Sequence, residues 1–126
     1  MYTDLLIRIK NAQLARKDMV RAPFSNADLA VAELLHNHGF VASATKKGRA
    51  PKRIIEVALK YDEGRGAITD VRFISKSSRR LYAGYREISS VRGGFGIAVV
   101  STSKGIMAAS DARKQKVGGE LLFEIW

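Results

Sequence analysis

Five residues near the end of the chain bring together three hydroxyls, a cation and a glycine: Ser101, Thr102, Ser103, Lys104 and Gly105. The order Ser-x-x-Lys matches the motif in which a lysine activates a serine at the start of a helix in penicillin-recognising enzymes. Here the residues follow the β-branched run from Ile97 to Val100, and a chain of 126 residues lacks room for the partner elements of such a site. Acyl transfer by Ser101 and Lys104 therefore stays an alternative. The segment is interpreted as a polar contact surface at the end of a rigid strand, or as a polar turn without function.

The formal charge of the chain is +10, from 22 lysines and arginines against 12 aspartates and glutamates. Such an excess favours a polyanionic partner, and nucleic acid first of all. The major groove of DNA favours a long reading helix. Base edges and 2′-hydroxyls of irregular RNA, by contrast, can be met by hydroxyls and backbone amides from loops and strand ends. The sequence therefore favours RNA.

Several classes of site are disfavoured by the composition. Cysteine is absent, which excludes disulfides and thiolate metal sites, and the only histidines are His36 and His38. The glycine-rich segment 93–96 lacks the Gly-Lys-Ser/Thr order of a phosphate-binding loop, so it is interpreted as a sharp turn or as a place where RNA approaches the backbone. We expect no metal ion and no cofactor. The longest apolar run, at 95–100, is too short to span a membrane, and we expect a cytoplasmic protein.

Two helices are predicted in the first part of the chain. The first covers residues 3–17, with Thr3 as its N-cap. Its buried face is expected to consist of four apolar residues: Leu5, Leu6, Ile9 and Ala12. The second helix begins at Ser25, with Asp28 three residues on, and ends at Gly39.

The outward face of the first helix carries two candidate contacts for RNA, Arg8 and Asn11, which are three residues apart. Arg8 could equally form an ion pair with Asp4 in the i,i+4 arrangement, which contributes only a few tenths of a kcal/mol. Both interpretations of Arg8 stay open on the sequence alone.

A hairpin with a basic tip is predicted after the second helix. Its strands cover residues 41–45 and 53–61, and the segment 46–53 holds five cations and no acid. This tip is interpreted either as a solvated loop or as a phosphate contact.

The segment 62–66 interrupts the apolar pattern with two glycines and three charges, and it predicts a domain boundary. Residues 1–65 would form an N-terminal αβ domain and residues 66–126 a β-rich, RNA-binding C-terminal domain. The first carries 12 basic and 7 acidic residues and the second 10 and 5, so each has a net charge of +5. Charge alone does not select the binding half.

Short strands are predicted beyond this boundary, over residues 68–74, 81–88, 95–102 and 120–126, with one short helix over 110–116. The expected fold class is therefore α+β, made of two small α/β domains. Helices pack on a short sheet in the first domain, and the second is rich in strands.

Cations and aromatic rings are interleaved within the predicted 81–88 region and just before it: Lys76, Arg79, Arg80, Tyr82 and Tyr85. Such a mixture suits phosphates and unstacked bases. In a regular strand the two tyrosines would face opposite sides unless Gly84 forms a bulge, so at most one of them is expected to stack on RNA.

Four segments together carry a family resemblance: Asp4 to Ala12, Ile74-Ser75-Lys76, Gly96 to Gly105, and Gly118-Gly119-Glu120. In this combination and order the chain closely resembles the small-subunit ribosomal protein eight family of the bacterial type. The resemblance runs from the first helix to the last residue.

This resemblance implies a two-domain, non-enzymatic protein of the small ribosomal subunit. It would bind the central domain of the ribosomal RNA early in assembly, chiefly through its C-terminal half, beside neighbouring ribosomal proteins. Ser101, Thr102 and Ser103 would then lie against an irregular stretch of an RNA helix, with Tyr82 at the same place. The Gly118-Gly119-Glu120 segment would supply close backbone approach and one carboxylate.

Some relatives also repress translation of their own operon by binding its messenger RNA, so a repressor without a ribosomal role stays the second alternative. One departure concerns the loop before Tyr82. This chain has Ser77-Ser78 followed by Arg79-Arg80 where many relatives have Pro-Gly, which predicts a less stiff and more basic loop. The predicted RNA-binding residues are Ser101, Thr102, Ser103, Lys104, Tyr82, Gly118, Gly119, Glu120, Lys76, Arg79, Arg80, Arg8 and Asn11.

Overall fold

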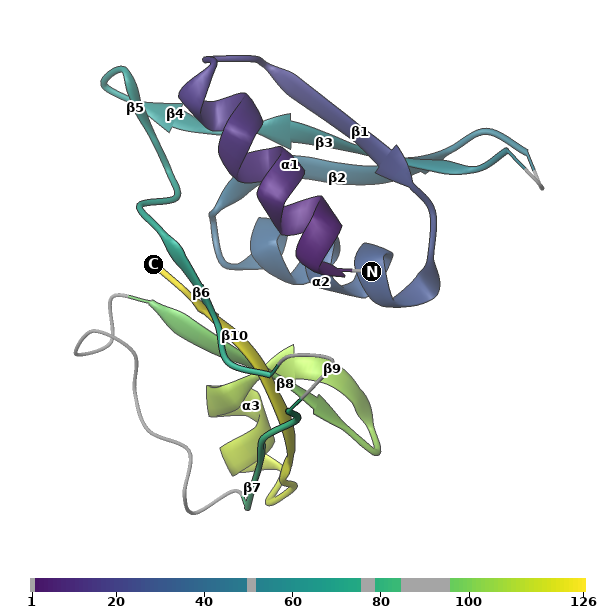
Figure 1. Ribbon diagram of the computed structural model, residues 1–126, viewed down its shortest axis with the longest axis vertical. Helices are drawn as coiled ribbons and strands as arrows, with labels where there is room; N and C mark the ends of the chain where they lie inside the picture. Colours follow the sequence, from purple (N-terminus) through teal and green to yellow (C-terminus); the bar gives the residue numbers. More distant parts are fainter. Residues whose placement is uncertain (1, 50–51, 76–78, 85–95) are drawn as a thin grey trace. The chain divides into compact units, whose positions relative to one another are not determined.

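The chain forms two compact units, Met1–Ile68 and Thr69–Trp126 (Figure 1). A computed structural model describes residues 2–49, 52–75, 79–84 and 96–126. Lys76 of the predicted site, the candidate ring of Tyr85, and the glycine-rich segment up to residue 95 lie outside the described residues.

The first unit packs two helices against a small antiparallel sheet whose strand order is β1-β3-β2. Helix α1 contacts β1 and β3, α2 contacts β2, and the two helices contact each other, so both cover the same face of the sheet. The elements are α1 (Tyr2–Leu14), β1 (Met19–Pro23), α2 (Asn26–Asn37), β2 (Val41–Lys47), β3 (Ile54–Leu59), β4 (Tyr61–Asp62) and β5 (Arg65–Gly66).

The buried face of α1 is the predicted one, with Leu5, Leu6, Ile9 and Ala12 all in the core. The predicted N-cap is wrong: the helix already includes Tyr2, whose ring is buried, so Thr3 lies inside the first turn. The helix also ends before residue 17. Its last turn is closed at Arg16, whose φ of 56° cannot continue a right-handed helix.

Both ends of α2 are as predicted. The Ser25 side chain accepts a hydrogen bond from the Asp28 amide at 3.1 Å, and Gly39 adopts a φ of +81° just beyond the C-cap. These are local devices that a few consecutive residues determine.

Strand β1 is one element of this unit that the sequence analysis did not find, and β5 is another. The alternation in β1 buries Val20 and Ala22 and exposes Met19, Arg21 and Pro23. Only two apolar side chains therefore enter the core, too few for a strand pattern to stand out.

The segment predicted to hold the domain boundary, 62–66, belongs to the small β4–β5 hairpin of the first unit. Beyond it the chain remains attached to α1, because the Gln13 amide donates to the Ile68 carbonyl at 2.6 Å and accepts from the Ile68 N–H at 3.2 Å. The first unit therefore extends as far as Ile68.

The second unit is an antiparallel sheet with one short helix. Its strand order is β6-β10-β8-β9, and β7 also pairs with β10. The elements are β6 (Val71–Phe73), β7 (Tyr82–Ala83), β8 (Ile97–Thr102), β9 (Gly105–Ala108), α3 (Ala109–Lys114) and β10 (Gly119–Ile125). The predicted α+β fold class is confirmed, although β6 is much shorter than the predicted strand over 68–74 and β9 was not predicted.

Helix α3 covers one face of this sheet through small side chains. Ala109 and Ala112 of the helix lie in one buried cluster with Ala98 and Val100 of β8. Alternation along β8 turns Val99 to the other face, which is the side of Phe123 and Ile125 and is fully buried at these positions. Both faces of β8 are thus buried from Ala98 to Val100, directly before Ser101.

Candidate nucleic-acid interface

The residues from Ser101 to Gly105 form a tight hairpin turn rather than the free end of a strand. Thr102 pairs with Gly105, so the loop between β8 and β9 consists of Ser103 and Lys104. The Thr102 hydroxyl donates to the Gly105 carbonyl at 2.9 Å and accepts from the Lys104 amide at 3.1 Å. Gly105 has a φ of 113°, a conformation that favours glycine.

The hydrogen bonds of the turn separate the Thr102 hydroxyl, which has a structural role, from the hydroxyls of Ser101 and Ser103. The hydroxyl of Thr102 holds the turn, which leaves it only one acceptor position for another partner. Ser103 and Lys104 are exposed at the tip, and Ser101 is half-buried on the strand. Within the part of the chain that the structure describes, the Ser101 and Ser103 hydroxyls make no hydrogen bond.

The same turn removes the support for a catalytic serine. In a Ser-x-x-Lys site the lysine lies one helical turn after the serine. Here Ser101 is in an extended strand and Lys104 is in the loop of a hairpin.

Strand β10 brings Tyr82 and Ser101 into one row. Glu120 is paired with Tyr82 of β7 on one side and with Ser101 of β8 on the other. Directly opposed residues of antiparallel strands point to the same face of a sheet, so these three side chains share a face. It is the face opposite α3, because the next pair along, Val100 and Leu121, packs with that helix. We call this set, Tyr82, Glu120 and Ser101, the recognition row.

The recognition row combines an aromatic ring, a carboxylate and a hydroxyl. Tyr82 is 67% exposed, an unusual degree for a large ring that a folded chain could bury. Within the described residues, none of the three side chains has a hydrogen-bond or ion-pair partner. Their polar groups are therefore available to a ligand.

The two glycines that precede Glu120 are required by the sheet itself. A Cβ at Gly119 would overlap the carbonyl of Ser101, and a Cβ at Gly118 would collide with the carbonyl of Ala83. They let β10 pass closely between β7 and β8, which aligns the recognition row. Their predicted contact with RNA stays a prediction.

Ser75 is a positioning residue whose role the sequence analysis did not identify. Its side chain is buried, accepts from the Leu81 amide at 3.0 Å and donates to the Leu81 carbonyl at 3.4 Å. It therefore closes the loop that carries Arg79 and Arg80, both exposed, and holds the start of β7 beside β10. The role could not be predicted from the sequence, because it depends on hydrogen bonds to the backbone of Leu81, six residues further along the chain.

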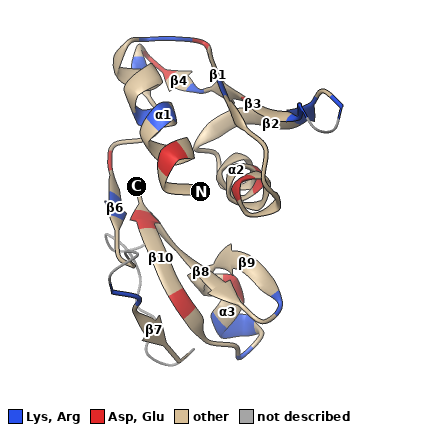
Figure 2. Cartoon of the chain, turned by 45° about the vertical axis from the view of Figure 1, so that its right-hand side comes forward, with Lys and Arg blue, Asp and Glu red and all other residues tan. Residues whose placement is uncertain are grey.

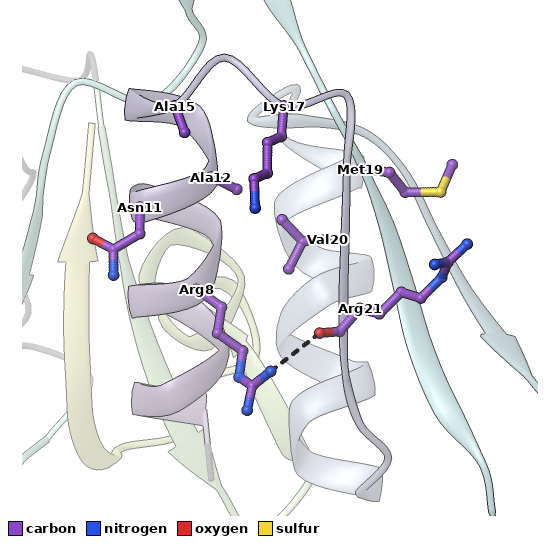
Figure 3. Close-up of a pocket in the computed structure, with 8 residues that line it drawn as sticks. All are labelled: Arg8, Asn11, Ala12, Ala15, Lys17, Met19, Val20 and Arg21. Atoms are coloured by element: carbon purple, nitrogen blue, oxygen red, sulfur yellow. Dashed lines mark hydrogen bonds between the residues drawn. The ribbon is translucent and has the colours of Figure 1, made fainter.

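The other two predicted residues, Arg8 and Asn11, lie on α1 in the first unit. Arg8 makes the predicted i,i+4 ion pair, with its Nε 2.9 Å from an Asp4 carboxylate oxygen. Its Nη1 also donates to the Arg21 carbonyl at 3.4 Å (Figure 3). Both Arg8 and Asn11 line a hollow between α1 and β1.

The electrostatics of the first unit centre on Glu56, which is only 8% exposed. Its carboxylate lies 2.9 Å from the Lys47 ammonium and 3.2 Å from the Arg21 guanidinium. Hydrogen bonds from Lys47, and next from Arg21, hold the pKa of Glu56 below its ordinary value of 4.5. Apart from the two cations at Glu56, lysines and arginines are grouped at the end of the β2–β3 hairpin (Figure 2).

Among the described residues, no group of histidine, cysteine, aspartate or glutamate is arranged to hold a metal ion. In that same part of the chain no helix is long and apolar enough to cross a membrane.

A sequence model of ribosomal protein S8 matches residues 1–126, the whole chain. The chain belongs to the ribosomal protein S8 family. Relatives named small ribosomal subunit protein uS8 include one from Mycoplasmopsis agalactiae, 43% identical over 124 residues that cover 98% of this chain and 95% of the relative. The relative from Sorangium cellulosum is 44% identical over 125 residues, with 98% and 95% covered. That from Xylella fastidiosa is 47% identical over 120 residues, with 94% and 91% covered.

Membership of this family confirms the predicted resemblance. It also confirms the expectation of a ribosomal protein rather than an enzyme, which overturns the acyl-transfer alternative.

Proposed function

We propose that this chain is a structural protein of the small ribosomal subunit that binds the central domain of the ribosomal RNA directly and supports its assembly. Specific binding lies in the second unit, through the recognition row and the hairpin turn beside it. Neighbouring small-subunit proteins are its further partners. The observation that carries the proposal is the alignment of Tyr82, Glu120 and Ser101 by strand pairing, with no internal partner for their polar groups in the described part of the chain.

The chemistry of the row favours bases and sugars over phosphates. A carboxylate accepts hydrogen bonds and repels phosphate, so Glu120 selects an amino group or a 2′-hydroxyl. Ser101 can both donate and accept beside it. The exposed ring of Tyr82 offers a stacking surface for a base that is not paired in a helix. Such a combination suits an irregular stretch of RNA.

Phosphates are met by cations outside the row. Lys104 stands at the tip of the β8–β9 hairpin, and Arg79 and Arg80 precede β7. These side chains supply affinity that depends on salt, whereas the row selects the shape of the RNA.

A binding comparison tests this function. The full chain is titrated with transcripts of the central, 5′ and 3′ domains of the small-subunit ribosomal RNA at equal salt, and tight binding is expected for the central domain alone. Crosslinking in cells, followed by sequencing of the attached RNA, should recover the same region. Equal affinity for all three transcripts, or recovery of messenger RNA without ribosomal RNA, would contradict the proposal.

A further inference from the structure

A single peptide group, between Ile68 and Thr69, joins the two units of the chain without a linker. Ile68 is the last residue of the first unit and Thr69 is the first residue of the second. The carbonyl of this peptide accepts a hydrogen bond from Gln13 Nε2 at 2.6 Å, and its N–H donates to the Trp126 carbonyl at 2.6 Å. Each bond lies within its own unit, so the two units hold opposite sides of one planar group.

The first unit holds Ile68 by its side chain and by both of its backbone polar groups. The side chain is only 3% exposed. While Gln13 Nε2 donates to the Ile68 carbonyl, Gln13 Oε1 accepts from the Ile68 N–H at 3.2 Å. The preceding Ala67 amide donates to the Lys60 carbonyl at 2.9 Å. The first unit is therefore fixed up to the carbonyl of its last residue.

The route of the Gln13 side chain depends on Gly66. A Cβ at Gly66 would overlap the Gln13 side chain and push it away from Ile68. The φ of Gly66 lies outside the left-handed region, so the backbone itself does not require glycine there. Clearance for Gln13 is thus the structural role of this glycine.

The second unit holds Thr69 and Asp70 against the end of β10. The Trp126 carbonyl accepts from the N–H groups of Thr69 and Asp70, the latter at 3.2 Å, and the Trp126 N–H donates to the Asp70 carbonyl at 3.1 Å. These bonds continue the pairing of β6 with β10, in which Val71 lies opposite Ile125. The second unit is therefore fixed from the N–H of its first residue onward.

Only two backbone dihedral angles separate the fixed parts of the units, ψ of Ile68 and φ of Thr69, because the peptide between them is planar. Rotation about the first turns the carbonyl away from Gln13, and rotation about the second turns the N–H away from Trp126. Hinges in proteins are a few residues at the ends of elements that absorb such changes. Any turn at this hinge must therefore break a hydrogen bond.

We propose that the Ile68–Thr69 peptide is the hinge of this chain and that the Gln13 side chain is the latch that keeps it closed. The N–H can leave Trp126 only by swinging the carbonyl of the same plane, which Gln13 holds, so the latch restricts both rotations. A hinge restricted in this way leaves the first unit few orientations to lose when the protein joins its neighbours, which lowers the entropic cost of assembly. The inference goes beyond the proposed function and is tested on the chain without RNA, so either can fail while the other stands.

Amide hydrogen exchange of the free chain tests the latch. Gln13→Met keeps the length of the side chain and removes both of its hydrogen bonds to Ile68. Exchange of the Thr69 N–H should become about two- to twelvefold faster, the change that corresponds to losing one hydrogen bond. This N–H is bonded in the other unit, so a purely local role of Gln13 would change the exchange of Ile68 alone. Unchanged exchange of Thr69 would overturn the proposal.

A second variant disturbs the same latch without changing Gln13 itself. Gly66→Ala should displace the Gln13 side chain and speed the exchange of Thr69 as well. The matched control is Tyr61→Phe, which removes another side-chain hydrogen bond of the same unit, from the Tyr61 hydroxyl to the Lys17 carbonyl at 2.7 Å. It should leave the exchange of Thr69 at the wild-type rate. Equal acceleration in the control would show a general loosening of the unit and contradict the latch.

The tumbling of the two units in solution tests the position of the hinge. Two glycines inserted between Ile68 and Thr69 separate the Gln13 contact from the Trp126 contact, so both bonds can form while each unit turns. The rotational correlation time of each unit, measured by NMR relaxation, should become shorter than in the wild type. Correlation times that stay at the wild-type values would show that the hinge is not at this peptide and would refute the proposal.

Discussion

Tyr82 and Ser101 lie on the same face of one sheet, each paired directly with Glu120. They are brought there by two different strands on opposite sides of β10. The aromatic ring and the hydroxyl therefore lie on one face of the sheet, with a carboxylate between them, and we propose that they contact one RNA together. The proposed contacts with RNA can be tested separately, because stacking, charge and hydrogen bonding respond differently to substitution and to salt.

Replacing Tyr82 with Ala should weaken binding to the central-domain RNA by about 1–3 kcal/mol, the usual cost of losing one stacked base. The slope of log affinity against log salt should stay unchanged, because no cation is removed. Tyr82→Phe is the control, since it keeps the ring and should retain most of the affinity. A flattened slope in the Ala variant would show that Tyr82 acts through the surrounding charges instead.

Replacing Arg79 and Arg80 with Gln should have the opposite signature. Both side chains are exposed before β7, and we expect them to meet phosphates. The double variant should bind all RNAs more weakly and flatten the salt slope by up to about two units, at about 0.7–0.9 for each phosphate that is no longer neutralised. Salt titrations on cognate and unrelated RNA measure this. A loss of affinity confined to the cognate RNA would assign base reading to these arginines.

Thr102→Val should lower the free energy of unfolding by about 0.5–1.5 kcal/mol, because the Thr102 hydroxyl bridges two backbone groups of the turn. Ser103→Ala is the matched control. Its hydroxyl has no hydrogen bond among the described residues, so its removal should leave stability unchanged. Urea unfolding of both variants decides the matter, and equal stability of Thr102→Val and the wild type would refute the role assigned to Thr102.

Glu56 should make the stability of the first unit depend on pH in the acid range. Its pKa is lowered in the folded chain by Lys47 and then Arg21, so its contribution is fully present above the ordinary value of 4.5 and is lost as the pH falls through the folded value. The stability difference between wild type and Glu56→Gln should therefore be constant at neutral pH and shrink below about pH 4.5. Urea unfolding between pH 7 and about pH 3 measures it. A difference that is independent of pH would contradict the assignment.

The sequence predicted what neighbouring residues determine by themselves. The buried face of α1, the Ser25 cap and the Gly39 terminus depend on side chains within a turn or two of one another. The fold class was predicted for the same reason, from local periodicity in most of its elements.

Pairing over long distances in the chain was not predictable in this way. Strand β1 was missed because Arg21 and Pro23 dilute its pattern, and β9 was missed because a polar turn conceals the return of the chain after Thr102. The recognition row depends on which strands lie on either side of β10, and periodicity contains no such information.

The sequence alone could not assign a separate role to each residue of the candidate site. Three adjacent hydroxyls formed one candidate, yet Thr102 is engaged in the turn while Ser101 and Ser103 are not. The need for glycine at positions 118 and 119 of the sheet became visible only from the positions of neighbouring carbonyls, and their contact with RNA stays a prediction.

The central claim is that the recognition row and the hairpin turn beside it, rather than the cations, select the RNA, and the double variant Ser101→Ala and Ser103→Ala tests it most directly. Its affinity is measured by titration against a central-domain transcript and an unrelated RNA duplex at the same salt. We predict a loss of about 1–3 kcal/mol on the central-domain RNA, where a partner is left unpaired in a buried contact, and almost none on the duplex. Equal weakening on both RNAs, or none on either, would contradict the account.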